Sequence, residues 1–215
     1  MRRFIREFAY DLKEPGIHMV MIPMAALAFI VTMIIVQKAL DAAGATNAVA
    51  LPLLEILIPS LGGYGAIMLM QGLLDTEGGE LAFTYPRTYL YWGLIRQFRF
   101  FILYASLITA VCIAVSSIMR IKFAPVFFLT LSQSFAVMAV SFLGVALSKK
   151  VSVGLIVLVA FVAIQFTIGW EFEAFNRIYV LSGSTPSNEE LNSILYNSLI
   201  IGVFGWGLGQ VWVRP

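Results

Sequence analysis

Side chains that could carry catalysis or bind a metal are scarce in this chain of 215 residues, which contains one histidine, His18, and one cysteine, Cys112. A single cysteine excludes an internal disulfide and a cysteine metal cluster. A single histidine excludes most histidine-based catalysis and metal binding. The sequence also has no H-E-x-x-H motif and no Walker phosphate-binding loop. We therefore predict no catalytic residue, no metal site and no cofactor in this chain.

The residue composition indicates a membrane protein. Hydrophobic residues make up 60% of the chain and charged residues 12%, and the mean hydropathy is +0.90. A water-soluble domain of this size could not bury that much apolar surface. This excludes a disordered chain, a collagen-like fibre and an ordinary cytosolic enzyme, and leaves a protein that crosses the membrane several times. The net charge of +2 is too small to indicate a nucleic-acid partner.

Six apolar runs have lengths near the ~20 residues that a membrane-spanning helix needs. Backbone groups cannot stay unpaired in hydrocarbon, so we expect each run to be a helix. A signal peptide ending at Ala26-Leu27-Ala28 is the alternative for the first run, but that run continues for eight residues beyond it. We predict an all-α membrane protein in which residues 1–215 form a single transmembrane domain. Its six transmembrane helices span about 17–36, 52–74, 100–118, 123–147, 151–170 and 191–211.

The distribution of Lys and Arg predicts the orientation, because cytoplasmic segments carry the excess of basic residues. With both termini in the cytoplasm, ten basic residues lie inside and four lie outside. The four that are predicted to lie outside are Lys38, Arg120, Lys122 and Arg177. We therefore predict a multi-pass protein of the cell membrane with both termini cytoplasmic.

Residues 1–14 are predicted to form an N-terminal amphipathic interfacial helix. Such a helix lies in the headgroup plane, with its apolar face in contact with membrane lipid. Two interpretations are open: an anchor that sets the angle of the first span, or an anchor whose polar face also docks a cytoplasmic partner. The apolar residues, which share an arc of about 140° on a helical wheel, are Phe4, Ile5, Phe8, Ala9 and Leu12.

Glu55 is the one acidic residue well inside a predicted span, and ionisable residues within a membrane are functional candidates. Because it follows Pro52 by three residues, it lies near the outer end of the span, where a carboxylate can reach water. The alternative is a role in a transport path or in a subunit contact. Further along the same span, residues 59–65 (PSLGGYG) contain a proline and three glycines. We expect them to interrupt and kink the helix.

Small polar residues gather on one face of the predicted fourth span, within an arc of about 80°. Faces of this kind usually pack helix against helix, and a transport path or subunit contact along the face is the alternative. In the sixth span, Gly205-x-x-x-Gly209 fits the same packing pattern. The residues of the fourth-span face are Thr130, Ser134, Ser141, Gly144 and Ser148.

The longest inner segment, residues 75–99, reads DTEGGELAFTYPRTYLYWGLIRQFR. Pro86 suits the first turn of a helix, where its missing N–H costs nothing. We therefore expect an amphipathic helix from about Arg87 toward the third span, lying near the inner membrane surface. A short surface helix between two spans is a rigid element through which a cytoplasmic protein can move those spans. The alternative is an ordinary interfacial connector.

The arrangement as a whole resembles the ABC-2 class of ABC transporter permeases. The shared features are a cytoplasmic amphipathic helix, six spans with both ends inside, and a cytoplasmic coupling helix between spans two and three. In that family the coupling segment often carries an acidic–glycine stretch, a leucine, and a proline with a basic residue soon after. The matching residues are Glu77-Gly78-Gly79-Glu80-Leu81 and Tyr85-Pro86-Arg87. The topological resemblance covers the whole chain, and the motif covers about eleven residues.

The resemblance implies a permease subunit that is not itself an enzyme. ATP and Mg²⁺ would be bound by a separate cytoplasmic ABC ATPase subunit, and a second permease copy or a different permease subunit would complete the transporter. The expected activity is export of an amphiphilic substrate such as a drug, peptide, lipid or glycan. The residues predicted to couple this chain to the ATPase are Glu77, Glu80, Phe83, Tyr85, Pro86 and Arg87.

Other functions are compatible with the same composition. An ion-coupled secondary carrier would need buried charges at mid-membrane and an inverted repeat, and the sequence shows neither clearly. A non-catalytic membrane scaffold or immunity protein needs no special residues. A membrane enzyme is disfavoured because no base accompanies a nucleophile.

The predicted topology can be tested with single-cysteine variants in a Cys112→Ser background. A cysteine at residue 3 or residue 88 should react with a membrane-impermeant maleimide only after the cells are permeabilised, because both positions are predicted to be cytoplasmic. A cysteine at residue 120, which is predicted to lie outside, is the matched control and should react in intact cells. Labelling of residue 3 or 88 from outside would contradict the topology.

Overall fold

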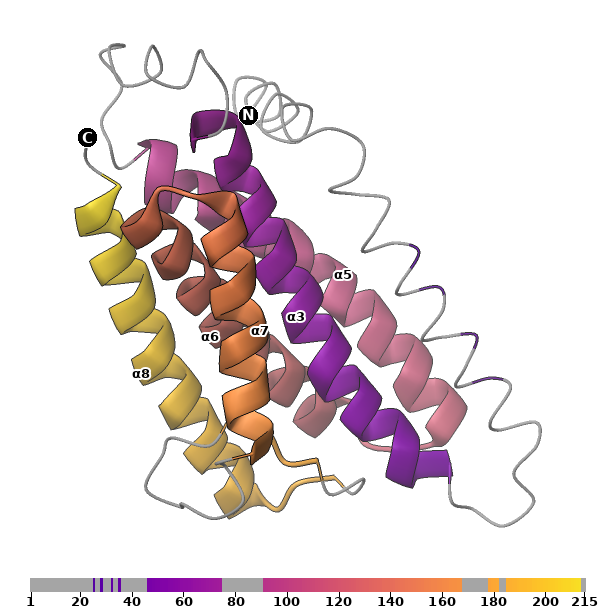
Figure 1. The fold of residues 1–215 in the computed structure, drawn as a ribbon. Helices are drawn as coiled ribbons and strands as arrows, with labels where there is room; N and C mark the ends of the chain where they lie inside the picture. The colour runs from indigo at the N-terminus through magenta and orange to yellow at the C-terminus, as the bar shows by residue number, and fades with distance from the viewer. Residues whose placement is uncertain are drawn as a thin grey trace.

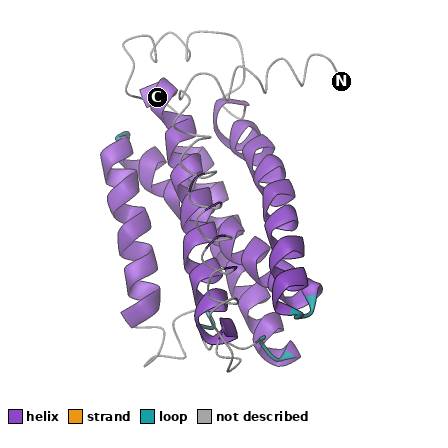
Figure 2. Cartoon of the chain, turned by 90° about the vertical axis from the view of Figure 1, so that its right-hand side faces the viewer, coloured by secondary structure: helices purple, strands orange, loops and turns teal. Residues whose placement is uncertain are grey.

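The computed structural model of the protein describes residues 46–74, 91–167, 178–181 and 185–213, together with the single residues Ala25, Ala28, Thr32 and Ile35. Across these residues the secondary structure is helical, with no strand (Figure 2). Five long α-helices and one π-helical turn follow one another along the chain. They are α3 (Thr46–Leu74), η1 (Tyr91–Ile95), α5 (Arg96–Met119), α6 (Phe123–Ser148), α7 (Val151–Thr167) and α8 (Asn188–Trp212).

The five α-helices form an antiparallel bundle, in which each helix runs opposite to the one before it (Figure 1). α6 lies at the centre and packs against α3, α5, α7 and α8. Residues 120–122 and the start of α8 lie at one end of the bundle, called the outer end after its predicted orientation. Residues 149–150, η1 and the end of α8 lie at the opposite, inner end. Described segments predicted to lie on one side of the membrane therefore share one end of the bundle.

Four of the described helices are long and apolar enough to cross a membrane. α7 is shorter, with 17 residues, which is at the lower limit of the ~17–25 residues of a spanning helix. The described part of the chain is thus an all-α bundle with candidate membrane spans, and it does not show six of them. The four long apolar stretches are Leu51–Gln71, Gly93–Met119, Phe123–Ser148 and Asn188–Trp212.

The predicted boundaries of the fourth and sixth spans lie close to the ends of α6 and α8, whereas α3 begins at Thr46, before the predicted residue 52. α6 begins at the predicted residue, Phe123, whereas α8 begins three residues before the predicted 191. The reason is a capping box: the Ser187 hydroxyl accepts the Glu190 N–H at 3.3 Å, and the Glu190 carboxylate accepts the Ser187 N–H at 2.9 Å. These reciprocal bonds satisfy two backbone donors that the first turn of a helix leaves without partners.

Several sequence predictions concern parts of the chain outside the described residues, and they stay predictions. Within the predicted first span, four single residues are helical and exposed, and the Thr32 hydroxyl donates to the Ala28 carbonyl at 2.8 Å. The undescribed stretches are the surface helix at 1–14, the rest of the span at 17–36, residues 75–90 of the coupling segment at 75–99, and residues 168–170 of the fifth span.

α3 runs through both of its prolines as one helix, so the expected interruption at residues 59–65 is wrong, and the expected kink there stays a prediction. Packing against α5 supports this stretch. The Tyr104 hydroxyl donates a hydrogen bond to the Ile58 carbonyl. A side chain from a neighbouring helix thus bonds the α3 backbone beside Pro59 and ties this stretch of α3 to α5.

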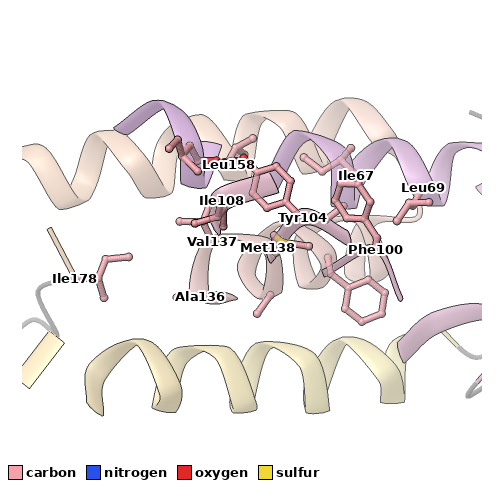
Figure 3. Close-up of a cluster of buried hydrophobic side chains, with 14 of the residues drawn as sticks. Ile67, Leu69, Phe100, Tyr104, Ile108, Ala136, Val137, Met138, Leu158 and Ile178 are labelled. Carbon is pink, nitrogen blue, oxygen red and sulfur yellow. Dashed lines mark hydrogen bonds between the residues drawn. The ribbon is translucent and has the colours of Figure 1, made fainter. Parts of the chain in front are cut away.

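The core between α3, α5 and α6 is continuous and apolar (Figure 3). From α5, the side chains of Phe100, Tyr104 and Ile108 lie close to Val137 and Met138 of α6. All five side chains are at most 5% exposed. Because lipid tails are as apolar as these side chains, close packing rather than exclusion of water holds helices together within a membrane.

α8 packs on α6 through a row of glycines. A Cβ atom placed on Gly205 would lie 3.0 Å from the carbonyl carbon of Ala139, and one placed on Gly209 would lie 2.6 Å from the ring of Phe142. Gly207, in contrast, has nothing within 4 Å of the position of a Cβ atom. The packing predicted from Gly205-x-x-x-Gly209 is therefore confirmed.

Two alanine substitutions on α8 should differ in their effect on stability. Gly205→Ala should lower the free energy of unfolding by about 1–3 kcal/mol, because the added methyl group meets the α6 backbone and separates the helices. Gly207→Ala is the matched control, and it should leave stability unchanged or raise it by up to about 1 kcal/mol through helix propensity. Unfolding by SDS in mixed micelles measures both values, and equal effects would contradict the packing described here.

Candidate functional site

Glu55 lies on α3 in the outer half of the bundle, and its side chain is 2% exposed. The expectation that this carboxylate reaches water at the membrane surface is therefore wrong. A carboxylate that leaves water loses several kcal/mol of solvation, so it needs hydrogen-bond donors or opposite charge around it. The groups that surround Glu55 define the candidate site.

Three N–H groups converge on a single oxygen of this carboxylate, Glu55 Oε2. The backbone N–H groups of Val180 and Leu181 donate to it at 2.8 Å and 3.3 Å. The Gln133 side chain of α6 donates through Nε2 at 3.2 Å. Hydrogen bonds to a charged acceptor are stronger than those between neutral groups. Glu55 therefore ties α3 both to α6 and to the segment that precedes α8.

Residues 178–181, here called the outer plug, enter the bundle at its outer end. The Ile178 N–H donates to Gln165 Oε1 of α7 at 3.3 Å, and the Ile178 carbonyl accepts from Gln133 Nε2 at 2.8 Å. Together with Glu55, these side chains come from three different helices. The backbone of the outer plug is thus held by side chains of α3, α6 and α7.

The side chains of the outer plug fill the space between the helices. Ile178, Tyr179 and Val180 are at most 4% exposed, and Figure 3 shows Ile178 toward one end of the buried cluster. Leu181 has a φ of 53°, which is rare for a residue other than glycine. Successive backbone N–H groups can form a concave site for an anion, and here the N–H groups of Val180 and Leu181 both donate to Glu55.

Tyr179 is the second titratable group at this site. Burial, followed by the negative charge of Glu55, raises the pKa of the Tyr179 hydroxyl above its usual value, so the phenol stays neutral at physiological pH. The described site therefore combines one carboxylate with amide groups, a phenol and apolar walls. Within the described residues, no group of three or more His, Cys, Asp or Glu could hold a metal ion. This chemistry is suited to binding hydrogen-bond donors.

The predicted polar face of α6 is buried between helices. The Thr130 hydroxyl donates to the Val126 carbonyl at 2.8 Å, and the Ser134 hydroxyl donates to the Thr130 carbonyl at 2.7 Å. The Ser141 hydroxyl lies 2.7 Å from the position of a Cβ atom on Gly63 of α3. The face therefore packs helix against helix, as expected, and its role in a transport path or subunit contact stays a prediction.

An apolar groove of ≈ 280 Å³ lies over α6, between α5 and α8. The hydroxyl of Ser132 is the one side-chain polar group in its lining, and it donates to the Leu129 carbonyl at 2.9 Å. The groove therefore suits hydrocarbon, such as a lipid tail, and offers little to a polar group. Its lining consists of Phe101, Phe128, Leu131, Ser132, Phe135, Leu195 and Leu199.

At the inner end, η1 and the start of α5 form the described part of the predicted coupling segment at 75–99. Arg96 and Gln97 are buried there, so the expectation of a surface helix is wrong for these residues. The Leu94 N–H donates to Gln210 Oε1 of α8 at 2.7 Å. Gly93 permits this approach, because a Cβ atom there would lie 2.3 Å from the same oxygen. π-Helical turns are frequent at functional sites. α8 is therefore bonded to the chain at the point where the coupling segment enters the bundle.

Lys149 closes the same end of the bundle. Its ammonium group donates to the Trp212 carbonyl in the last turn of α8, where the partial negative charge of a helix favours a cation. Burial lowers the pKa of Lys149 from its usual value. The connection between α6 and α7 is thus fastened to the end of α8.

The six predicted coupling residues all lie within 75–90, outside the described residues. The structure neither brings them together nor separates them, so their role stays a prediction. They are Glu77, Glu80, Phe83, Tyr85, Pro86 and Arg87.

Three glutamines that the sequence analysis does not single out carry polar contacts at the two ends of the bundle. Gln133 and Gln165 bond the outer plug, and Gln210 bonds η1. Each is a lone amide in a long apolar run. Because polar side chains inside a membrane hydrogen-bond across helices, such isolated amides are the signal that indicates these contacts.

No family model, curated protein or solved structure matches this chain. A functional proposal therefore has to start from the contacts of Glu55 toward the outer end of the bundle and of Gln210 at the inner end.

Glu55→Ala should lower the free energy of unfolding by at least about 2 kcal/mol, because it removes the acceptor that the Val180 and Leu181 N–H groups share and one of the two acceptors of Gln133. Glu189→Ala, which removes an exposed carboxylate in the first turn of α8, is the control and should cost less than about 1 kcal/mol. Both values follow from SDS unfolding in mixed micelles. A small cost for both variants would show that Glu55 does not hold the outer plug.

Proposed function

We propose that this chain is a transmembrane permease subunit of an ATP-driven ABC transporter of the ABC-2 type, with six spans and both termini in the cytoplasm. A separate cytoplasmic ATPase subunit binds ATP and Mg²⁺. A second permease subunit, identical or different, completes the transporter. The complex exports an amphiphilic substrate from the cell membrane.

The observation that carries the proposal is the contact of η1, which follows the coupling motif in the chain, with α8. The motif at residues 77–87 is followed, after three residues, by η1 at the inner end of the bundle. η1 continues directly into α5, and it is bonded to α8 through the Leu94 N–H and Gln210. A force applied to the coupling segment would therefore act on α5 through the chain and on α8 through this hydrogen bond.

The packing of the bundle supports the requirement for a second permease subunit. α6 is surrounded by the other four described α-helices, and its core side chains are buried. Because this centre is filled, we infer that a second permease subunit is needed to complete a path across the membrane. Apolar side chains exposed on α7 and α8, such as Val159 and Val203, leave ample surface for lipid and for that partner.

An ion-coupled carrier is the second candidate, and the burial of Glu55 is the observation that favours it. Carriers use carboxylates inside the membrane to bind protons or cations. Here, however, the carboxylate accepts hydrogen bonds from the outer plug and from Gln133, which is a sufficient structural role. The energy source separates the two candidates, because the carrier follows an ion gradient and the permease requires an ATPase.

The coupling segment can be tested with the combined variant Glu80→Ala, Tyr85→Ala, Arg87→Ala. The chain is purified from its native membranes in mild detergent, and the co-purifying ATPase is identified by its Walker A motif. We expect the variant to insert normally and to lose the ATPase. Truncation of a buried anchor such as Tyr85 alone should cost about 2 kcal/mol, or about thirtyfold in affinity.

The control variant carries the same kinds of change at the outer end: Arg120→Ala, Glu189→Ala, Tyr196→Ala. All three side chains are exposed, so this variant should retain the ATPase. The purified chain without a partner should hydrolyse no ATP, because its sequence has no phosphate-binding loop. Retention of the ATPase by the coupling variant, or hydrolysis by the chain alone, would refute the proposal.

A further inference from the structure

The bundle binds the backbone of the outer plug through side chains, as a protein binds a ligand. Its described backbone hydrogen bonds go to side chains, namely those of Gln165, Gln133 and Glu55. The three side chains belong to α7, α6 and α3, and these helices also pack directly against one another. Removal of the outer plug would therefore leave α3, α6 and α7 packed against one another and would vacate a chamber between them.

The walls of this chamber are the chemical complement of the outer plug. Ile178 and Tyr179 occupy apolar space, since both belong to the buried core cluster. Val180 packs with Leu129 of α6 and Ile194 of α8 in a second cluster. The polar groups of the walls are the Glu55 carboxylate and the amides of two glutamines. α6 and α7 contribute no charged residue at all, and Glu55 is the one charged residue of α3.

The geometry points to this chamber as a binding site for an amphiphile with a positively charged head group, which takes the place of the outer plug. The head group would bind Glu55 Oε2 in place of the N–H groups of Val180 and Leu181. The apolar tail would occupy the space of Ile178 and Tyr179. This inference rests on the proposed export function and names the class of its substrate.

A cationic head group is favoured over a neutral or anionic one for an electrostatic reason. The outer plug and Gln133 offer Glu55 neutral N–H donors, whereas an ammonium group offers up to three donors together with a full positive charge. A neutral alcohol replaces fewer donors and no charge, and an anion would be repelled by the carboxylate. A cationic head group should therefore compete with the outer plug for the Glu55 carboxylate, and an uncharged analogue should not.

Binding can be measured with dodecylammonium and its neutral analogue dodecan-1-ol. The full-length chain is placed in nanodiscs of phosphatidylcholine without any ATPase, and partition into empty nanodiscs is subtracted. We expect the chain to bind dodecylammonium about tenfold or more tightly than dodecan-1-ol. Glu55→Gln keeps the shape of the side chain and removes its charge, so it should lose this preference. Glu189→Gln, at an exposed carboxylate, should keep it.

Displacement of the outer plug can be measured without any change to Glu55. In a Cys112→Ser background, the Val180→Cys variant places a thiol at a site that is 4% exposed. Dodecylammonium should increase its rate of maleimide labelling severalfold, and dodecan-1-ol should not. Thr185→Cys, at an exposed position outside the outer plug, is the control and should label at one rate under all conditions.

Each result decides the proposal. Preference for dodecylammonium that depends on Glu55, together with faster labelling at residue 180, supports it. Equal binding of the two probes, or an unchanged preference in a folded Glu55→Gln variant, refutes the binding site. Binding without faster labelling refutes displacement of the outer plug. Because the ATPase is absent from these measurements, their failure is distinct from failure of the coupling segment to retain an ATPase.

Discussion

One constraint governs this structure: inside a membrane, backbone N–H and C=O groups must find their partners within the protein. The α-helices meet it by themselves, and side chains meet it where the described chain leaves the α-helical form inside the bundle. At the outer plug, Glu55, Gln133 and Gln165 bond the backbone of residues 178–181. At η1, Gln210 bonds the Leu94 N–H. The need to bond this backbone explains why polar side chains are buried at these two places.

The central position of α6 follows from its own composition. It contains no charged residue, and its hydroxyl groups at Thr130 and Ser134 bond within the helix. All of its faces can therefore be covered by other helices at no electrostatic cost. The glycines of α8 bring that helix close to the α6 backbone at Ala139. α6 thus forms a fixed support, and the functional groups stand where other elements meet it.

The helices were largely predictable from the sequence, and the polar contacts were not. Apolar length alone placed α6 to within one residue at each end, because the hydrocarbon thickness fixes how long a span must be. The same pattern marked Glu55 as unusual but placed it in contact with water. Its real surroundings depend on the outer plug, which is more than 100 residues away in the chain. Likewise, α3 continues as a helix through Pro59, and Tyr104 of another helix bonds the carbonyl of the neighbouring Ile58. Contacts between distant segments leave no periodic signal in a single sequence.

The two ends of the bundle are joined by α8, and this connection relates the proposed coupling to the proposed binding site. At its inner end α8 is bonded to η1 through Gln210, and in its outer half Ile194 packs against Val180 of the outer plug. Glu55 stands on α3 instead. A displacement of α8 relative to α3, driven through η1, would therefore move Val180 away from the carboxylate that binds its N–H. Coupling of this kind needs only a rigid helix with a different contact at each end. With 25 residues, α8 covers ~37 Å, which is longer than the ~30 Å hydrocarbon core. An event at the inner end of the bundle could thus be transmitted to the outer plug through this helix alone.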